Sequence, residues 1–298
     1  MKLATLRNGT RDGRLVVVSR DLTRYTDASF LVPTLQGALD DWRRLAPHLA
    51  AMAQSLEADA VPSARFHEND ALSPLPRAYQ WLDGRVGPSH GEPLLNRGGS
   101  DAFAAPREPI RVAGEGSGVE VGARIAAIVG DVPISAGRQE ASEAVRLIVL
   151  LNDVSAPPLG GVEPFNGSGV FEGKPPAALS PVAVTPDELG EAWDGGKVGL
   201  PLLVDRNGKP QGRADAGAGM AFDFPALIVH AARMRPLGAG AVISVGAASS
   251  KASLGAGEGK TVSAGSFDFG DTVRIEMKDG SGRSVFGAIE RTVEKYAR

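Results

Sequence analysis

Two short runs constrain the fold of this chain more than any others: residues 122–131, which read Gly-Ala-Arg-Ile-Ala-Ala-Ile-Val-Gly-Asp, and residues 152–155, which read Asn-Asp-Val-Ser. Apolar and β-branched residues fill 124–129 and 148–151, and both segments are therefore predicted to be strands. Arg124 is expected on a strand beside Asp153. A carboxylate buried in such a setting needs a compensating cation, and Arg124 is the candidate.

The rest of the chain favours a β-rich architecture. Its 298 residues suggest one large domain and a smaller appendage. The chain holds 38 Gly and 21 Pro, and only 5% of its residues are aromatic, a mix that favours turn-rich β structure over a helical bundle. The predicted fold class is mainly β with α (α+β).

Charge and cysteine content exclude several classes of function. A net charge of −3 gives no electrostatic footprint for nucleic acid or for an anionic membrane. The absence of cysteine excludes disulfides, thiol catalysis and thiolate metal sites. Because the first residues turn polar early and no apolar run reaches about 18 residues, we expect a soluble, cytoplasmic protein.

The first part of the chain is predicted to form a small α/β domain over residues 1–70, followed by a larger domain over 71–298. Residues 2–6 and 14–19 read as a hairpin. Apolar residues recur at helical spacing from Leu35 to about Glu57, after a possible cap at Thr34. Pro47 is expected to kink or split this helix.

Helix signals in the second part are few, at 137–147, 185–193 and 224–234. Thr185 as N-cap, with Pro186 and Glu188 after it, is a strong start signal. Further strands are predicted at 199–204, 241–245, 272–277 and 285–289. Glycine-containing segments at 205–209 and 278–283 predict hairpin turns.

Segments 128–133, 150–155 and 174–205, with others spread over almost the whole chain, resemble the fumarylacetoacetate hydrolase family in its bacterial branch with a small N-terminal domain. The resemblance implies a mixed β-sandwich roll, an active site at one open end and a homodimer. Family enzymes hold Mg²⁺ or a similar cation, chelate a small 2-oxo or 1,3-dicarbonyl acid on it, and cleave or decarboxylate beside the carbonyl.

The metal ligands that the resemblance implies are altered. In the family they are an Asp seven residues before a catalytic His, a Glu-x-Glu pair on one strand, and the Asp of Asn-Asp-Val-Ser. Asp83, seven residues before His90, and Asp153 match, whereas Gly122 and Arg124 replace the two glutamates. No tightly bound cofactor is therefore predicted. Mg²⁺ would bind weakly, at Asp153 with Asp83, only if a weakened site survives.

Other positions match in part. Lys174 stands where the family has a lysine that stabilises an oxyanion, and Glu172 stands where a glutamine is usual. Ala247 replaces the threonine of a substrate-contacting Gly-Thr pair. The resemblance thus implies a catalytic set of His90, Lys174 and Arg124, with Asp83, Glu172 and Ala247 on the substrate side.

Three hypotheses stay open. The first is a hydrolase or lyase acting on carbon–carbon bonds of a small carboxylate, with Arg124 and Lys174 replacing much of the metal's role. His90 with Asp83 would then handle protons, although His90 also reads as an exposed loop histidine. The second is a catalytically silent paralogue that binds or regulates a partner, in which Arg124 only forms a salt bridge with Asp83 or Asp153 that fills an emptied cavity. The third is a weakened Mg²⁺-dependent hydrolase that takes its missing ligands from Glu120 or Glu172.

Overall fold

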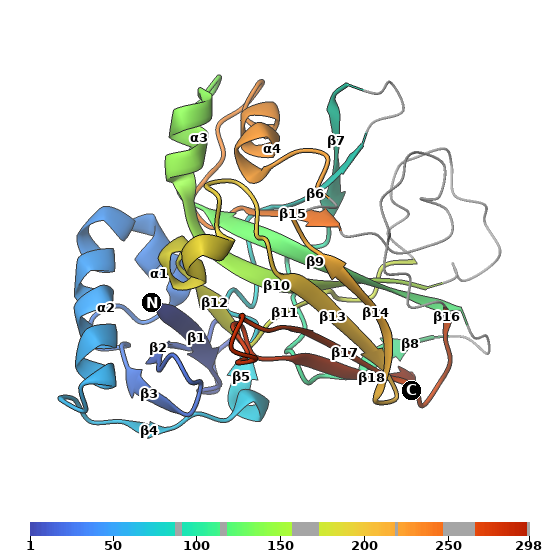
Figure 1. Ribbon diagram of the computed structural model, residues 1–298, viewed down its shortest axis with the longest axis horizontal. Coiled ribbons are helices and arrows are strands. Elements are labelled where there is room, and N and C mark those ends of the chain that lie inside the picture. The colour runs from blue at the N-terminus through green and yellow to red at the C-terminus, as the bar shows by residue number, and fades with distance from the viewer. Residues whose placement is uncertain (87–90, 114–117, 157–172, 218–219, 247–265, 297–298) are drawn as a thin grey trace.

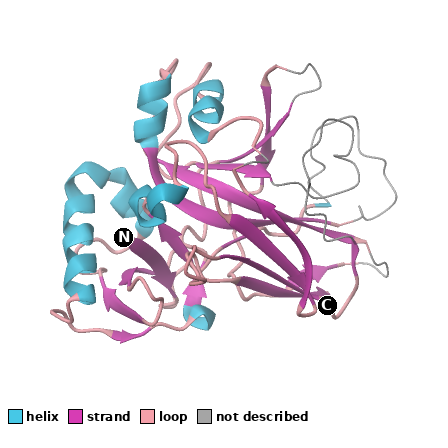
Figure 2. Ribbon diagram, in the orientation of Figure 1, coloured by secondary structure: helices cyan, strands magenta, loops and turns pink. Residues whose placement is uncertain are grey.

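The computed structural model describes residues 1–86, 91–113, 118–156, 173–217, 220–246 and 266–296. Strands make up most of its regular structure, and helices lie at the margins (Figure 2). The predicted α+β class is confirmed. None of the helices within these ranges has the length and hydropathy that crossing a bilayer requires.

The N-terminal segment forms one end of a large sheet. Its strands run antiparallel in the order β4-β3-β2-β1, and α1 and α2 pack beside them (Figure 1). These elements are β1 (Lys2–Leu6), β2 (Arg14–Val18), β3 (Arg24–Asp27), β4 (Ala64–Arg65), α1 (Leu35–Asp40) and α2 (Trp42–Glu57). The predicted hairpin is confirmed, and Thr34 caps α1 by accepting a hydrogen bond from the Gly37 amide.

The break in the predicted helix is not at the proline. The backbone leaves helical geometry at Asp41, with φ −131° and ψ 42°, whereas Pro47 lies inside the continuous α2. A proline removes only one backbone donor, and burial of Leu45, Leu49 and Leu56 along one face of α2 offsets that loss. The expected split at Pro47 is therefore wrong, and a kink there stays a prediction.

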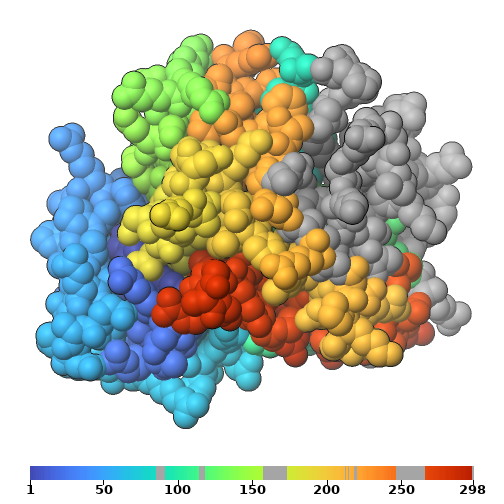
Figure 3. All heavy atoms as spheres, viewed as in Figure 1, coloured from blue at the N-terminus to red at the C-terminus, as the bar shows by residue number. Residues whose placement is uncertain are grey.

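The large sheet continues from β1 into the second part of the chain. Its order is β4-β3-β2-β1-β12-β10-β9-β15-β6-β7, and β15 runs parallel to β6. The added strands are β6 (Trp81–Val86), β7 (Pro93–Gly98), β9 (Val119–Val129), β10 (Val145–Ser155), β12 (Val182–Val184) and β15 (Val242–Gly246), with β5 (Ala71–Leu72), β11 (Ala178–Leu179) and β16 (Ser266–Phe267) paired off this path. Because β1 pairs with β12, the sheet crosses the boundary expected near residue 70, and that boundary stays a prediction. In the space-filling view the N-terminal segment lies directly against the later chain (Figure 3).

A second, five-stranded sheet has the order β14-β13-β17-β18-β8. Its strands are β8 (Ile110–Val112), β13 (Pro201–Arg206), β14 (Lys209–Asp215), β17 (Thr272–Met277) and β18 (Ile289–Lys295). The predicted turn between β13 and β14 is confirmed, with positive φ at both Asn207 and Gly208. The strand expected at 285–289 is wrong: β18 begins only at Ile289, after Gly287 takes a φ of 72°.

Helices in the second part are shorter than predicted. They are α3 (Arg138–Ala144) and α4 (Phe224–Ala231), with the short 3₁₀ helix η3 (Pro186–Ala192). Another 3₁₀ helix, η1 (Glu68–Asp70), ends the N-terminal segment. The predicted start of η3 is confirmed, with Thr185 at the N-cap and Pro186 as the first residue, but the Thr185 side chain makes no capping hydrogen bond. Its hydroxyl instead accepts a hydrogen bond from the Met1 amine.

The long central strands β9 and β10 are buried on both faces. One face contributes Ile125 and Leu150 to an apolar layer shared with the second sheet, which we call the inter-sheet layer. The other face contributes Ile128 and Leu151 to a layer shared with α1 and α2, which we call the helix-side layer. Burial of both faces explains the near-continuous apolar sequence of these strands.

Candidate functional site

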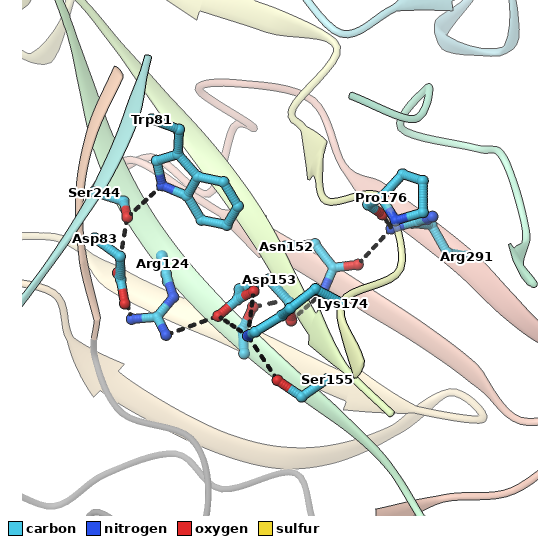
Figure 4. Close-up of polar contacts among 11 residues, drawn as sticks. Trp81, Asp83, Arg124, Asn152, Asp153, Ser155, Lys174, Pro176, Ser244 and Arg291 are labelled. Atoms are coloured by element: carbon cyan, nitrogen blue, oxygen red, sulfur yellow. Dashed lines mark hydrogen bonds and ion pairs between the residues drawn. The ribbon is translucent and has the colours of Figure 1, made fainter. Parts of the chain in front are cut away.

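A row of polar side chains crosses four neighbouring strands where the helix-side layer ends (Figure 4). Asp153 on β10 lies directly across from Gly122 on β9, and Arg124 is two residues further along β9. On the other side of β9, Ser244 on β15 lies opposite Asp83 on β6. Alternate residues of a strand share a face, so the pleat places these side chains together.

Arg124 bridges two carboxylates. Its Nη1 lies 2.9 Å from Asp83 Oδ1, and its Nη2 lies 2.9 Å from Asp153 Oδ2. The three side chains are only 6 to 9% exposed. The sequence left open a pairing with Asp83 or with Asp153, and the guanidinium binds both.

The cluster favours the charged form of its members. Burial alone would raise the pKa of Asp153, but the charges of Arg124 and Lys174 and their hydrogen bonds hold that pKa below its ordinary value. Burial likewise disfavours charge on Arg124, yet the two carboxylates outweigh it and raise the arginine's pKa. Two cations thus face two carboxylates, and their formal charges cancel.

Lys174 is the member of the cluster that reaches solvent. Its Nζ lies 3.1 and 3.3 Å from the two Asp153 carboxylate oxygens and 2.7 Å from Ser155 Oγ. Its side chain is 34% exposed, against 8% for Asp153. Any ligand approaching the cluster through its solvent-exposed part therefore meets this ammonium group.

A hydrogen-bond relay supports the Asp83 end. Trp81 Nε1 donates to Ser244 Oγ over 2.9 Å, and Ser244 Oγ donates to Asp83 Oδ1 over 2.9 Å. Sequence reasoning missed both Trp81 and Ser244. The available signal was a single hydroxyl residue inside the apolar run 241–245.

A second buried arginine fastens the Asp153 end from the opposite face of the sheet. Arg291 on β18 is 2% exposed, and it donates to Asn152 Oδ1 and to the Pro176 carbonyl, both over 3.1 Å. It also donates to the Glu108 carbonyl over 2.8 Å. Burial lowers the pKa of Arg291 to about 10, with the charge of Glu108 opposing that shift. Arg291 thereby ties the residue before Asp153 to the residue two after Lys174.

The contacts given above for this cluster do not include the other predicted site residues. His90, Glu172 and Ala247 lie outside the described residues. Glu120 lies on β9 directly across from Ser155, and the ion pairs and hydrogen bonds of the cluster given above do not include it. The proton-handling and substrate-side roles of these residues stay predictions.

The described residues do not fit a divalent cation. Mg²⁺ needs several oxygen ligands in near-octahedral arrangement. Within the described part of the chain, no group of three or more acidic or histidine side chains is placed to supply them. Asp83 and Asp153 are the two carboxylates that meet here, and the guanidinium of Arg124 lies between them.

Comparison with known proteins gives two matches to family models. Residues 1–77 match the fumarylacetoacetase N-terminal domain 2, and residues 79–294 match the fumarylacetoacetate hydrolase C-terminal domain. A search of curated proteins finds no match.

Solved structures share the fold over the full length of the chain. Maleylpyruvate hydrolase from Sphingobium sp. SYK-6, in complex with manganese(II) and pyruvate, has a TM-score of 0.69 at 19% identity, with all of both chains covered. A probable 2-hydroxyhepta-2,4-diene-1,7-dioate isomerase from Mycobacterium abscessus has a TM-score of 0.70 at 15% identity, again covering both chains completely. A 5-carboxymethyl-2-hydroxymuconate delta-isomerase from Mycobacterium smegmatis has a TM-score of 0.65 at 16% identity with the same coverage. Identities this low show a shared fold and leave the chemistry to be argued from the site.

Proposed function

Since this chain belongs to the fumarylacetoacetate hydrolase family, we propose that it acts on a small 2-oxo or 1,3-dicarbonyl acid without a bound metal, with Arg124 as the fixed cation of the site. The observation that carries this proposal is the 2.9 Å contact of Arg124 with both Asp83 and Asp153. Structures of similar fold include a maleylpyruvate hydrolase holding pyruvate, which supports a small oxo acid as the substrate class.

The charge of a guanidinium differs from that of a dication in a way that limits the chemistry. A guanidinium group is planar and fixed in place by its side chain, and it cannot coordinate a substrate oxygen as a metal ion does. Both Nη groups of Arg124 are already directed at carboxylates. The contact with substrate therefore falls to Lys174, whose Nζ is held by Asp153 and Ser155 and remains partly exposed.

The proposed reaction is hydrolysis of the C3–C4 bond of a 1,3-dicarbonyl acid with oxo groups at C2 and C4, or loss of a carboxylate carried by C3 of a 2-oxo acid. In the hydrolysis, water adds to the C4 carbonyl and C4 leaves as a carboxylic acid, and in the decarboxylation CO₂ leaves. In both, the electron pair of the broken bond passes onto the C2 oxo oxygen and gives an enolate, which then takes up a proton at C3. An ammonium group oriented before the reaction stabilises that developing charge at little reorganisation cost. Arg124 has an indirect role: it binds Asp153, and Asp153 in turn positions the Lys174 Nζ.

A second candidate is a catalytically silent binding or regulatory protein. It is favoured by the charge balance of the cluster, in which two cations and two carboxylates satisfy one another. Such a cluster can fill the space of a former binding site, because a buried ion pair can persist without any ligand.

Two measurements separate these functions. Activity on acylpyruvates after dialysis against a chelator is expected to persist, and activity that disappears and returns with Mg²⁺ would show a metal-dependent hydrolase instead. Calorimetry with pyruvate or oxalate is expected to show binding to the native protein and loss of binding in Lys174→Met. Lys209→Met, at an exposed residue of β14, is the matched control. No binding at millimolar ligand would favour the silent protein.

The family resemblance also leads us to propose a homodimer. Sedimentation equilibrium of the purified protein tests this proposal, and a monomer at micromolar concentration would contradict it.

A further inference from the structure

A hollow in the N-terminal segment collects positive charge that the proposed function does not use. It encloses about 180 Å³ and is lined by Leu6, Arg7, Arg14, Tyr25, Arg65, His67 and Asp70. Three arginines, one histidine and one aspartate are therefore among its lining residues. The chain as a whole has 35 acidic and 32 basic residues, so composition does not explain this local excess.

Separate elements bring these side chains together. Leu6 at the end of β1 lies opposite Arg14 at the start of β2, and Arg7 follows directly. The Arg7 amide donates to the Asp70 carbonyl over 3.2 Å, which fastens η1 to the end of β1. Arg65 ends β4, at the edge of the sheet (Figure 1). Backbone pairing thus holds the walls of the hollow in fixed positions.

Only one of the three arginines is neutralised. Arg14 Nη1 contacts Asp27 Oδ2 at 2.6 Å, and its Nη2 donates to the Tyr25 hydroxyl over 3.2 Å. Its Nε is buried without a hydrogen-bond partner. Arg7 and Arg65 have no ion pair with any carboxylate of the described ranges. Repulsion between neighbouring guanidinium groups is relieved when an anion lies between them.

We propose that this hollow binds a phosphate group, either free or carried by a small organic phosphate. Guanidinium groups suit this ligand because their paired N–H donors match its oxygens, and a dianion gains more than a monocarboxylate from several cations. The volume corresponds to several waters at about 30 Å³ each, which suits a compact group. Asp70 disfavours additional negative charge, but its carboxylate can accept a hydrogen bond from a ligand hydroxyl.

Calorimetric titration with inorganic phosphate, at ionic strength matched with chloride, tests the proposal on the full chain. Saturable binding is expected for the native protein. The double variant R7Q/R65Q is expected to bind at least about tenfold more weakly, since each guanidinium contributes charge-assisted hydrogen bonds. Arg43→Gln, an exposed arginine of α2 outside the hollow, is the matched control and should bind as the native protein does.

Two further measurements, a comparison of ligands and titrations of variants, identify the source of the phosphate and the place where it binds. Tighter binding of glycerol phosphate than of inorganic phosphate would assign an organic phosphate, and equal binding would assign the free ion. The proposal is overturned if the native protein shows no saturable binding, or if R7Q/R65Q binds as tightly while its circular dichroism and melting temperature are native. It is also overturned if Lys174→Met, at the separate Arg124 cluster, abolishes phosphate binding.

Discussion

Arg124 and Asp153 are diagonal neighbours on adjacent strands: Asp153 lies across from Gly122, and the Arg124 guanidinium reaches it over 2.9 Å from two residues further along β9. Diagonal pairs of this kind are within reach of long side chains. Glycine directly opposite Asp153 presents no side chain there. Glycine at position 122 and arginine at position 124 thus together allow a buried ion pair with Asp153.

Replacement of Arg124 by Met is expected to destabilise the fold strongly. The change leaves Asp83 and Asp153 buried without their shared cation, and breaking a buried pair in this way costs about 3 to 5 kcal/mol. Urea unfolding followed by circular dichroism measures the loss. Arg43→Met, on the exposed face of α2, should change the free energy of unfolding by less than about 0.5 kcal/mol. A similar small loss in Arg124→Met would mean that the ion pairs are not formed.

Lys174→Met is expected to lower stability by about 1 kcal/mol at neutral pH, because this ion pair is partly screened by solvent. Asp153 has a pKa held below its ordinary value. Its contribution is therefore fully present above the unfolded pKa of about 3.9 and is lost as the pH falls through the lower folded value. The difference between native protein and variant should accordingly shrink as the pH falls through the lowered folded pKa of Asp153, as measured by urea unfolding at successive pH values. A difference that stays the same while Asp153 becomes protonated would contradict the coupling of Lys174 to Asp153.

Ser244→Ala is expected to cost about 1 to 3 kcal/mol, because it removes the acceptor of the buried Trp81 Nε1 and a donor to Asp83. The melting temperature should fall, and intrinsic tryptophan fluorescence should change with the surroundings of Trp81. Ser63→Ala, at an exposed position, is the control and should leave both readouts native. Unchanged fluorescence with an unchanged melting temperature in Ser244→Ala would argue against the relay.

Arg291 and Asn152 are expected to be energetically coupled. Arg291→Met and Asn152→Leu each break the 3.1 Å hydrogen bond and leave a buried partner behind. Once one partner is gone, loss of the other costs less, so the double variant should be more stable than the sum of the single losses predicts. A coupling of about 1 to 2 kcal/mol in a double-mutant cycle is expected. Strict additivity would mean that the contact contributes nothing.

The sequence predicted the central strands well, because strands that are buried on both faces have a nearly continuous apolar sequence. Both 124–129 and 148–151 lie inside β9 and β10, although each strand extends to eleven residues. It also predicted Arg124 beside Asp153, since that neighbourhood depends on the pairing of two apolar strands. Errors arose where local signals were outweighed by packing, as at Pro47, or where a glycine with positive φ delayed a strand, as at Gly287.

Contacts between distant parts of the chain could not be read from local patterns. Arg291 meets Asn152 across 139 residues of sequence, and it comes from the other sheet. Its one local signal is its place between Ile289 and Val293, on the buried face of β18. Ser244 reaches Asp83 across 161 residues. An arginine or serine on the buried face of a strand predicts that a hydrogen-bond partner exists, but the sequence does not show which residue it is.

Arg124→Glu is expected to convert the cluster into a cation site. The change would place a third carboxylate between Asp83 and Asp153, and three clustered carboxylates repel one another unless a cation joins them. Without metal the variant should be strongly destabilised. Mn²⁺ should then raise its melting temperature in a concentration-dependent way, because a ligand that binds only the folded state stabilises it. The native protein should show no such rise, since its guanidinium already holds both carboxylates. An equal response of both proteins to Mn²⁺ would mean that Arg124 does not exclude the metal.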